Sequence, residues 1–138
     1  MEPCADLVVR EMIPTTPSFT SFMDMPIVEE YRFFTKNGKV EGFQPYWPEE
    51  AFEYEDNLPE DWQERLQKMA KPSPELLKDM IDMANKVVGN LDGDWSIDFL
   101  IDKNGLPYLT DMAEAHKNYR NESEFTYTRK GPVPGLNP

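Results

Sequence analysis

The 138-residue sequence has little cysteine, little histidine and few positive charges, and each shortage excludes a class of protein. Cys4 is the only cysteine, so the chain cannot form an intramolecular disulfide or a thiolate metal cage. A run of about 18 apolar residues, as a membrane helix needs, is absent, and no basic segment followed by an apolar one opens the chain. We therefore expect a free thiol in a reducing cytoplasm, with no signal peptide and no membrane partner.

Lysine and arginine number 14 against 26 acidic residues, which gives a net charge of −12 at pH 7. A chain this acidic offers no basic face, so direct binding to nucleic acid or to an anionic membrane is not expected. The acids concentrate in WPEEAFEYEDNLPEDWQE, residues 47–64. Such a run is typical of a solvated loop and helix start. The alternative is an acidic surface that docks on a basic partner or imitates DNA.

Hydrophobic residues make up 39% of the chain, which suits one domain over residues 1–138 with a core of two packed layers. Residues 5–13 predict a strand, followed by a loop rich in Pro, Ser and Thr. Asn37-Gly38 between β-rich arms predicts a hairpin with a type I′ turn. Helices are expected over 59–70 and 73–90, the second capped by Ser73.

A second Asn-Gly pair, Asn104-Gly105, predicts a hairpin over residues 95–115, and the polar residues 117–138 predict a loop or a loosely held tail. The order of these elements favours an α+β fold. We expect a mostly antiparallel sheet, built from the two Asn-Gly hairpins plus the N-terminal strand and covered by two helices.

Two aspartates stand in the middle of the second hairpin. A type I′ turn at Asn104-Gly105 places Asp98 opposite Asp111, and Ile101 opposite Tyr108. Side-chain alternation predicts a separate core face; its members are Ile97, Phe99, Ile101, Tyr108, Thr110 and Met112.

Like charges directly opposite each other on a sheet destabilise it. Three interpretations of Asp98 and Asp111 remain open: a divalent cation such as Mg²⁺ held by both carboxylates, an open polar face where both are solvated, or a catalytic acid/base dyad. If the two acids repel each other, the Asp98→Asn variant is expected to be more stable than the wild type without metal.

Three segments, in this order, resemble the C-terminal half of an ATP-grasp domain, as found in phage and bacterial ATP-grasp proteins similar to the cell-division-cycle 123 family. LVVREMIP, residues 7–14, resembles the strand that enters the nucleotide hinge. MPIVEEYRFFTKNGKVEGFQPYWP, residues 25–48, resembles the hairpin whose Glu-x-Arg pair faces the active site. GDWSIDFLIDKNGLPYLTDMAEA, residues 93–115, resembles the final hairpin that supplies metal-binding acids. Together they span most of the chain.

The resemblance implies a role for each matching residue. Asp98 and Asp111 would hold Mg²⁺ against the β- and γ-phosphates of ATP. Arg10 and Arg32 would lie near phosphate or an acyl-phosphate, with Glu30 orienting Arg32 as the second catalytic residue. Three hinge residues would line the adenine pocket; these are Glu11, Met12 and Ile13.

ATP-grasp ligases activate a carboxylate by phosphorylation and then let an amine attack it. Because the sequence begins close to the hinge, we expect the N-terminal domain and the lysine-bearing lid to be missing. Asp111 is followed by Met112 and Ala113, so the asparagine ligand usual in the superfamily is absent. The prediction is an ATP-grasp-derived domain, the nucleotide- and Mg²⁺-binding half of an ATP-dependent carboxylate–amine ligase, which is not competent alone and needs a partner half.

Two other functions remain open. The chain could be a non-catalytic acidic binding or inhibitor protein of phage type that reuses the fold and presents its acidic surface, as a DNA mimic or otherwise, to a protein target. It could also be a small structural module.

Overall fold

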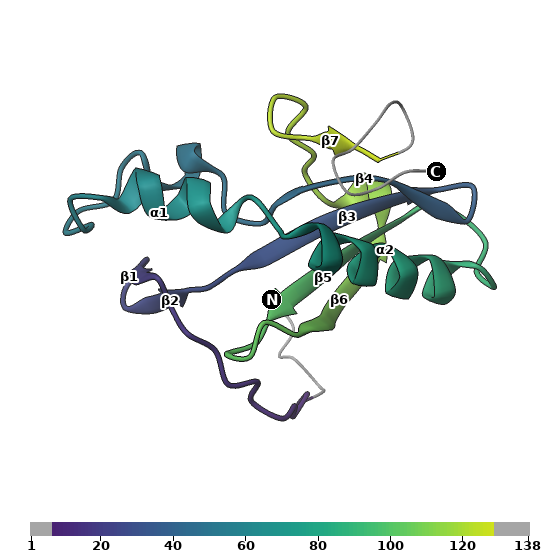
Figure 1. Cartoon of the computed structure of the whole chain (residues 1–138), viewed down its shortest axis with the longest axis horizontal. Helices are drawn as coiled ribbons and strands as arrows, with labels where there is room; N and C mark the ends of the chain where they lie inside the picture. Colours follow the sequence, from purple (N-terminus) through teal and green to yellow (C-terminus); the bar gives the residue numbers. More distant parts are fainter. Residues whose placement is uncertain (1–6, 129–138) are drawn as a thin grey trace, which may run out of the picture.

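The computed structural model describes residues 7–128, which form an α+β fold with a five-stranded sheet, a two-stranded sheet and two α-helices (Figure 1). The predicted fold class and the mostly antiparallel sheet are therefore confirmed. The elements in chain order are β1 (Phe19–Ser21), β2 (Met25–Ile27), β3 (Glu30–Lys36), β4 (Lys39–Pro45), the 3₁₀-helix η1 (Glu49–Phe52), α1 (Trp62–Met69), α2 (Pro74–Val88), β5 (Trp95–Ile101), β6 (Pro107–Glu114), the 3₁₀-helix η2 (Ala115–Lys117) and β7 (Thr126–Tyr127).

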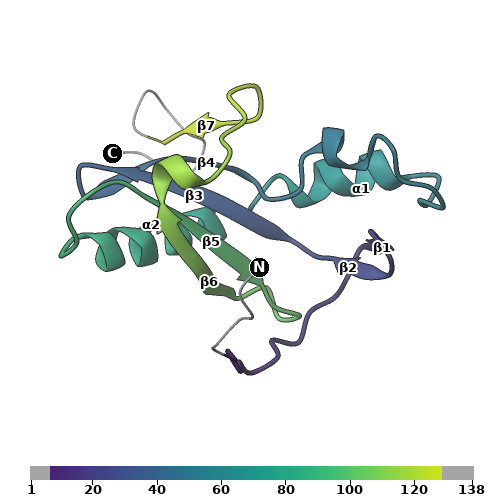
Figure 2. The same ribbon diagram turned by 180° about the vertical axis from the view of Figure 1, so that it is seen from behind.

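The main sheet has the strand order β6-β5-β3-β4-β7, and every neighbouring pair is antiparallel. Helix α2 packs across one face, and Figure 2 shows the sheet from the other side with α2 behind it. Ser73 caps α2, as predicted, by accepting a hydrogen bond from the Leu76 N–H at 3.2 Å. Between this helix and the sheet lies the main core, formed by Tyr31, Phe33, Val40, Phe43, Leu77, Met80, Ala84, Val88, Ile97, Phe99 and Ile101.

The two Asn-Gly hairpins turn differently. Asn37 and Gly38 have φ values of 52° and 79°, as the predicted type I′ turn requires. In the second hairpin Gly105 has a φ of 81°, whereas Asn104 does not have a positive φ. The Asp102 N–H donates to the Leu106 carbonyl, which closes a three-residue loop instead of the predicted two-residue turn. The Asp102 carboxylate favours this loop because it accepts hydrogen bonds from two loop N–H groups.

The predicted pairing of Asp98 with Asp111 is confirmed, but the register around it is not. Thr110 is an extra residue in β6 that forms a β-bulge beside this pair, so Phe99 pairs with Leu109. The longer loop shifts the register by one residue, and the bulge shifts it back before the aspartates are reached. Between loop and bulge the pairing differs from the prediction: Ile101 faces Pro107 rather than Tyr108.

The same shift changes which side chains reach the core. Leu109 packs against the main core, whereas Tyr108, predicted to lie there, is 43% exposed. The Thr110 side chain, also predicted for the core, donates from its hydroxyl to the Asp98 carbonyl at 3.3 Å. A polar hydroxyl at the bulge thus takes a backbone partner that the irregular ladder leaves available.

The strand predicted over residues 5–13 is not formed in its described part, residues 7–13. Leu7, Val9 and Met12 are 89%, 84% and 89% exposed. Strand propensity is realised only against a partner strand and a packed face, and this segment has neither, although β6 is an edge strand of the main sheet. The following stretch, expected as a loop, forms the short β1–β2 hairpin instead.

A second, smaller core lies at the end of the molecule where β1, β2, η1 and α1 meet (Figure 1). Its buried residues are Phe19, Ile27, Phe52 and Leu66, with Phe22, Trp47, Leu58, Trp62 and Met69 packed against them. The acidic stretch 47–64 is therefore not only a solvated run, because its apolar residues anchor it to this core.

Of the loop or loosely held tail predicted from residue 117, residues 118–128 are mostly loop, but they are packed against the main sheet. There β7 pairs with β4, and Phe125 and Asn121 are each only 9% exposed. Residues 129–138 lie outside the described part of the chain. Within residues 7–128 no helix is long and apolar enough to cross a bilayer.

Candidate functional site

Four polar side chains form a row across the face of the main sheet that α2 does not cover. The strand register pairs Asp111 with Asp98, Asp98 with Arg32, and Arg32 with Gln44, so the row runs over β6, β5, β3 and β4. The chain neighbours of these residues supply the core on the other face, since side chains alternate along a strand. We refer to Asp111, Asp98, Arg32 and Gln44 as the polar row.

Arg32 and Asp98 form a bidentate ion pair at the centre of the polar row. The Nε–Oδ1 distance is 2.9 Å and the Nη2–Oδ2 distance is 3.2 Å, with the two side chains 17% and 6% exposed. The Arg32 guanidinium also lies 5.0 Å from the centre of the Tyr46 ring. The positive charge that offsets Asp98 is therefore Arg32, and Asp98 fixes the orientation of Arg32. The family resemblance implied that Glu30 orients Arg32, and this role stays a prediction.

Asp111 differs from its partner across the strands because it is exposed to solvent. Its Oδ1 accepts a hydrogen bond from the Met112 N–H at 3.0 Å, which leaves most of the carboxylate's acceptor capacity directed to solvent. Cross-strand partners have Cβ atoms about 4.5–5.5 Å apart, so the two carboxylates start from neighbouring points on the sheet.

These two carboxylates fit Mg²⁺ only if other groups complete its coordination. Mg²⁺ demands six oxygen ligands and commonly takes one or two carboxylates, with substrate phosphates and water supplying the rest. Within residues 7–128 no group of three or more His, Cys, Asp or Glu side chains gathers around a common point. The polar row thus suits an ion that arrives with phosphate, and not a cage made entirely by the protein.

Glu30 lies two residues before Arg32 on the same strand and the same face. Its pKa is raised to about 7, chiefly because burial removes water from the carboxylate; the Trp47 indole lowers it, Asp98 raises it and Arg32 lowers it. The Trp47 nitrogen is close enough to favour the ionised form, although it makes no hydrogen bond of good geometry. Glu30 can therefore gain or lose a proton near neutral pH beside the polar row.

The other residues implied by the family resemblance lie less centrally. The Arg10 Nη1 donates to the Thr110 carbonyl at 2.5 Å, so Arg10 reaches the bulge next to Asp111. Of the three expected adenine-pocket residues, Glu11 and Met12 are exposed and Ile13 is partly buried. The structure brings Glu30, Arg32, Asp98 and Asp111 to one face, with Arg10 at its edge. The nucleotide-hinge role of residues 11–13 stays a prediction.

Gln44 is the member of the polar row that the sequence reasoning missed. Its Nε2 donates to the Tyr119 carbonyl at 3.2 Å, and its Oε1 accepts from the Asn121 N–H at 2.8 Å. These bonds fix the segment after η2 against the end of the row. The first hairpin holds no signal for it, because a type I′ turn at Asn37-Gly38 with regular pairing would place Phe43 opposite Arg32. A β-bulge between the Thr35–Val40 and Phe34–Gly42 pairs shifts the register by one residue and brings Gln44 opposite Arg32.

The site thus combines an exposed carboxylate, a fixed guanidinium and a carboxyl group that titrates near neutral pH. Such a set can bind a phosphate-bearing ligand, place a divalent cation and move a proton. No family model matches the chain, and neither a curated protein nor a solved structure matches it.

Proposed function

We propose that the polar row binds a Mg²⁺–nucleotide, and that the chain is the nucleotide- and metal-binding half of an ATP-dependent carboxylate–amine ligase. The observation that carries this proposal is the alignment of Asp111, Asp98 and Arg32 on adjacent strands, on the sheet face that α2 does not cover. A lid and an N-terminal half, supplied by another chain or segment, would complete the ATP site. The ordered resemblance to the C-terminal half of an ATP-grasp domain supports the same assignment.

Each residue of the row has a separate task in this proposal. Asp111 is exposed and serves as the main protein ligand of the cation. Asp98 holds the Arg32 guanidinium in a fixed orientation and adds a second carboxylate next to Asp111. Arg32 then directs its remaining N–H groups at a phosphate or an acyl-phosphate, since the planar guanidinium can donate parallel hydrogen bonds to two phosphate oxygens. Bound Mg²⁺ would supply charge neutralisation of the phosphates.

Glu30 supplies the acid–base function in this proposal. An amine that attacks an acyl-phosphate loses a proton, and a carboxylate with a pKa of about 7 can accept it at neutral pH. Arg32, two residues away, keeps the acyl-phosphate within reach of the same face. The chain would thus position both reacting groups, and positioning is a large part of the rate gain in such reactions.

Thermal unfolding with Mg²⁺ alone and with Mg²⁺–ATP tests this function. A ligand that binds the folded state raises Tm according to its concentration and affinity. We expect Mg²⁺–ATP to raise the Tm of the wild type and of the Asp92→Asn control, which removes an exposed acid outside the row. The Asp111→Asn variant should lose the shift. A wild-type Tm that does not change at millimolar nucleotide would contradict nucleotide binding by this half.

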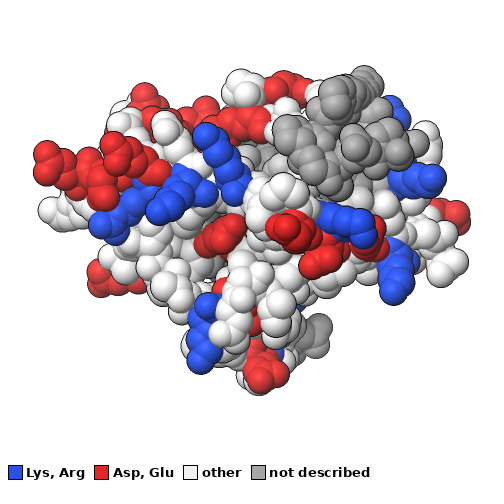
Figure 3. Space-filling view, in the orientation of Figure 1, with Lys and Arg blue, Asp and Glu red and all other residues white. Residues whose placement is uncertain are grey.

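A second function, a non-catalytic acidic binding protein, is favoured by a different observation. Acidic side chains crowd the end of the molecule formed by η1 and α1 (Figure 3), and the large apolar side chains of Met23 and Tyr54 are 100% and 90% exposed there. Exposed apolar groups framed by acids suit a basic protein partner. Neutralising several acids between Glu49 and Glu64, with Glu55 left intact, should abolish partner capture while leaving Tm unchanged; a loss of folding would instead indicate a structural role.

A further inference from the structure

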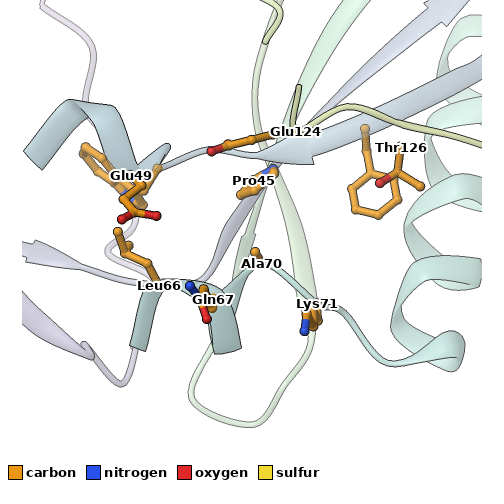
Figure 4. Close-up of a pocket in the computed structure, with 10 residues that line it drawn as sticks. Pro45, Glu49, Leu66, Gln67, Ala70, Lys71, Glu124 and Thr126 are labelled. Atoms are coloured by element: carbon orange, nitrogen blue, oxygen red, sulfur yellow. The ribbon is translucent and has the colours of Figure 1, made fainter. Parts of the chain in front are cut away.

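A hollow of about 300 Å³ lies between α1, the end of β4 and the β7 segment (Figure 4). Phe43 and Pro45 line it, and these residues alternate along β4 with Gln44 of the polar row. The hollow is therefore on the opposite side of the sheet from the polar row, and it needs no part of the proposed ligase site.

Half of the residues that line the hollow are apolar, and they belong to well-packed parts of the fold. Phe43 belongs to the main core and Leu66 to the second core, so the hollow lies where the two cores meet. Trp47 adds a large aromatic surface, and Ala70 leaves space at the end of α1. Ligand pockets commonly form at junctions of this kind, with apolar walls and a few polar groups that set orientation.

Carboxylates gather at one end of these walls. Glu49 and Glu124 line the hollow, and the Glu49 backbone lies close enough to the Glu124 carboxylate to favour its ionised form. The pKa of Glu124 is raised, first by burial and then by the charge of Glu50. Among residues 7–128 no lysine or arginine forms an ion pair with any of these three glutamates. Lys71 lines the hollow without pairing with them, and Figure 4 shows its nitrogen directed away from Glu124.

We propose that this hollow binds a primary ammonium group carried on an aliphatic chain. The methylenes would lie along Phe43, Trp47 and Leu66, where burial of apolar surface is favourable. The ammonium would reach Glu124 and Glu49, close enough to the Trp47 ring for a cation–π contact. Nucleotides and other anions are disfavoured here because the carboxylates repel them. Two sources share this chemistry, a free diamine and the side chain of a lysine on a protein partner.

Calorimetric titration of the full chain with 1,5-diaminopentane at low ionic strength tests the proposal. We expect binding to the wild type and roughly tenfold weaker binding to Glu124→Gln, which loses one charge-assisted hydrogen bond. Glu60→Gln is the matched control, since it removes an exposed acid that does not line the hollow. Thermal unfolding shows that each variant is folded before titration. An equal loss in both variants would mean non-specific attraction to an acidic protein and would overturn the proposal.

Two further titrations sharpen the result. Lys71→Gln should bind the diamine roughly two- to threefold more tightly, because a competing ammonium is removed from the same hollow. The neutral analogue 1,5-pentanediol should not bind, and binding equal to that of the diamine would overturn the ammonium assignment.

The source of the ammonium group is decided by a third ligand, an acetylated and amidated Gly-Lys-Gly peptide. If the peptide binds at least as tightly as the diamine and Glu124→Gln weakens its binding, the hollow binds a lysine side chain of a protein partner. If the diamine alone binds, the ligand is a free amine. Failure of both ligands would overturn the proposal, whatever the outcome of the Mg²⁺–ATP experiment.

Discussion

The polar row and the acidic end of the molecule both concentrate charge, but the two regions do so in opposite ways. In the polar row a buried carboxylate, Asp98, is matched by Arg32 across two strands, and the β-register fixes both side chains. Around η1 and α1 the acids lie on the surface of a small aromatic core and most of them face solvent. The Arg32–Asp98 ion pair depends on the fold being intact, whereas the surface acids around η1 and α1 are available to an outside partner.

The largest expected effect is the loss of the buried ion pair. Removing one partner of such a pair leaves the other buried and uncompensated, which costs about 3–5 kcal/mol. We expect Asp98→Asn to lower the free energy of unfolding in urea by about 3 kcal/mol, near the lower limit because Arg32 is not fully buried. The sequence predicted a rise in stability instead, because Asp111 was the only charged neighbour of Asp98 that the turn register identified.

Asp111→Asn is the control for this prediction, since it neutralises the exposed member of the aspartate pair. Its free energy of unfolding should change by less than about 0.5 kcal/mol. If Asp98→Asn proved more stable than the wild type, repulsion between the two aspartates would outweigh the Arg32 pair, and the contrast between the two regions would fail.

The difference between the expected and the observed role of Asp98 shows what a single sequence can supply. Pairing of Asp98 with Asp111 depended on local turn and strand signals, which the sequence contains. The two errors in that hairpin, the three-residue loop and the bulge at Thr110, cancel before the aspartates, so the pair was correct although the turn was not. Arg32 lies 66 residues away from Asp98. Its position next to Asp98 depends on β3 pairing with β5, and local turn signals do not determine that long-range pairing.

Other missed features have the same physical origin. Residues 7–13 have the apolar composition of a strand, but a strand also needs to pair with a neighbour and to pack on a core, and this segment does neither. The segment around Phe125 looked like a polar tail, yet one aromatic ring packing edge-on to Phe34 helps to hold it on the sheet. The two helices and the first hairpin were predictable because capping, helical spacing and an Asn-Gly turn are signals within a few residues.

The next largest effect concerns an acid of the second region whose carboxylate holds a strained turn. The β1–β2 turn holds Phe22, Met23 and Asp24 at φ values of 50°, 62° and 69°, a left-handed conformation that is costly for residues other than glycine. The Glu55 carboxylate stabilises it by accepting from the Phe22 N–H at 2.7 Å and from the Ser21 hydroxyl at 3.1 Å.

Replacing Glu55 with Ala should therefore lower the free energy of unfolding by about 1–2 kcal/mol, because two donors lose their charged acceptor. Exchange of the Phe22 amide hydrogen should become faster. The control is Glu53→Ala, an exposed neighbour in the same acidic stretch, whose effect should stay within about 0.5 kcal/mol. Equal effects of the two substitutions would show that the acids of this region are interchangeable.

The smallest effect is a pH dependence, and it comes from the one titratable group beside the polar row with a strongly raised pKa. Folding raises the pKa of Glu30 from 4.5 to about 7, so the folded state holds the Glu30 proton more tightly than the unfolded state. The stabilisation from this protonated carboxyl is fully present below pH 4.5 and is lost as the pH rises through 7. Because Glu30 is only partly buried, solvent screening reduces the effect to about 1 kcal/mol between pH 5 and pH 8.

Glu30→Gln keeps a neutral side chain at every pH, so its stability relative to the wild type should rise over that interval. Urea unfolding of both proteins at a series of pH values measures the difference, with Glu60→Gln as the control that shows no such trend. A difference that stays constant from pH 5 to pH 8 would mean that Glu30 is ionised throughout, and it would remove Glu30 as the proton acceptor of the proposed reaction.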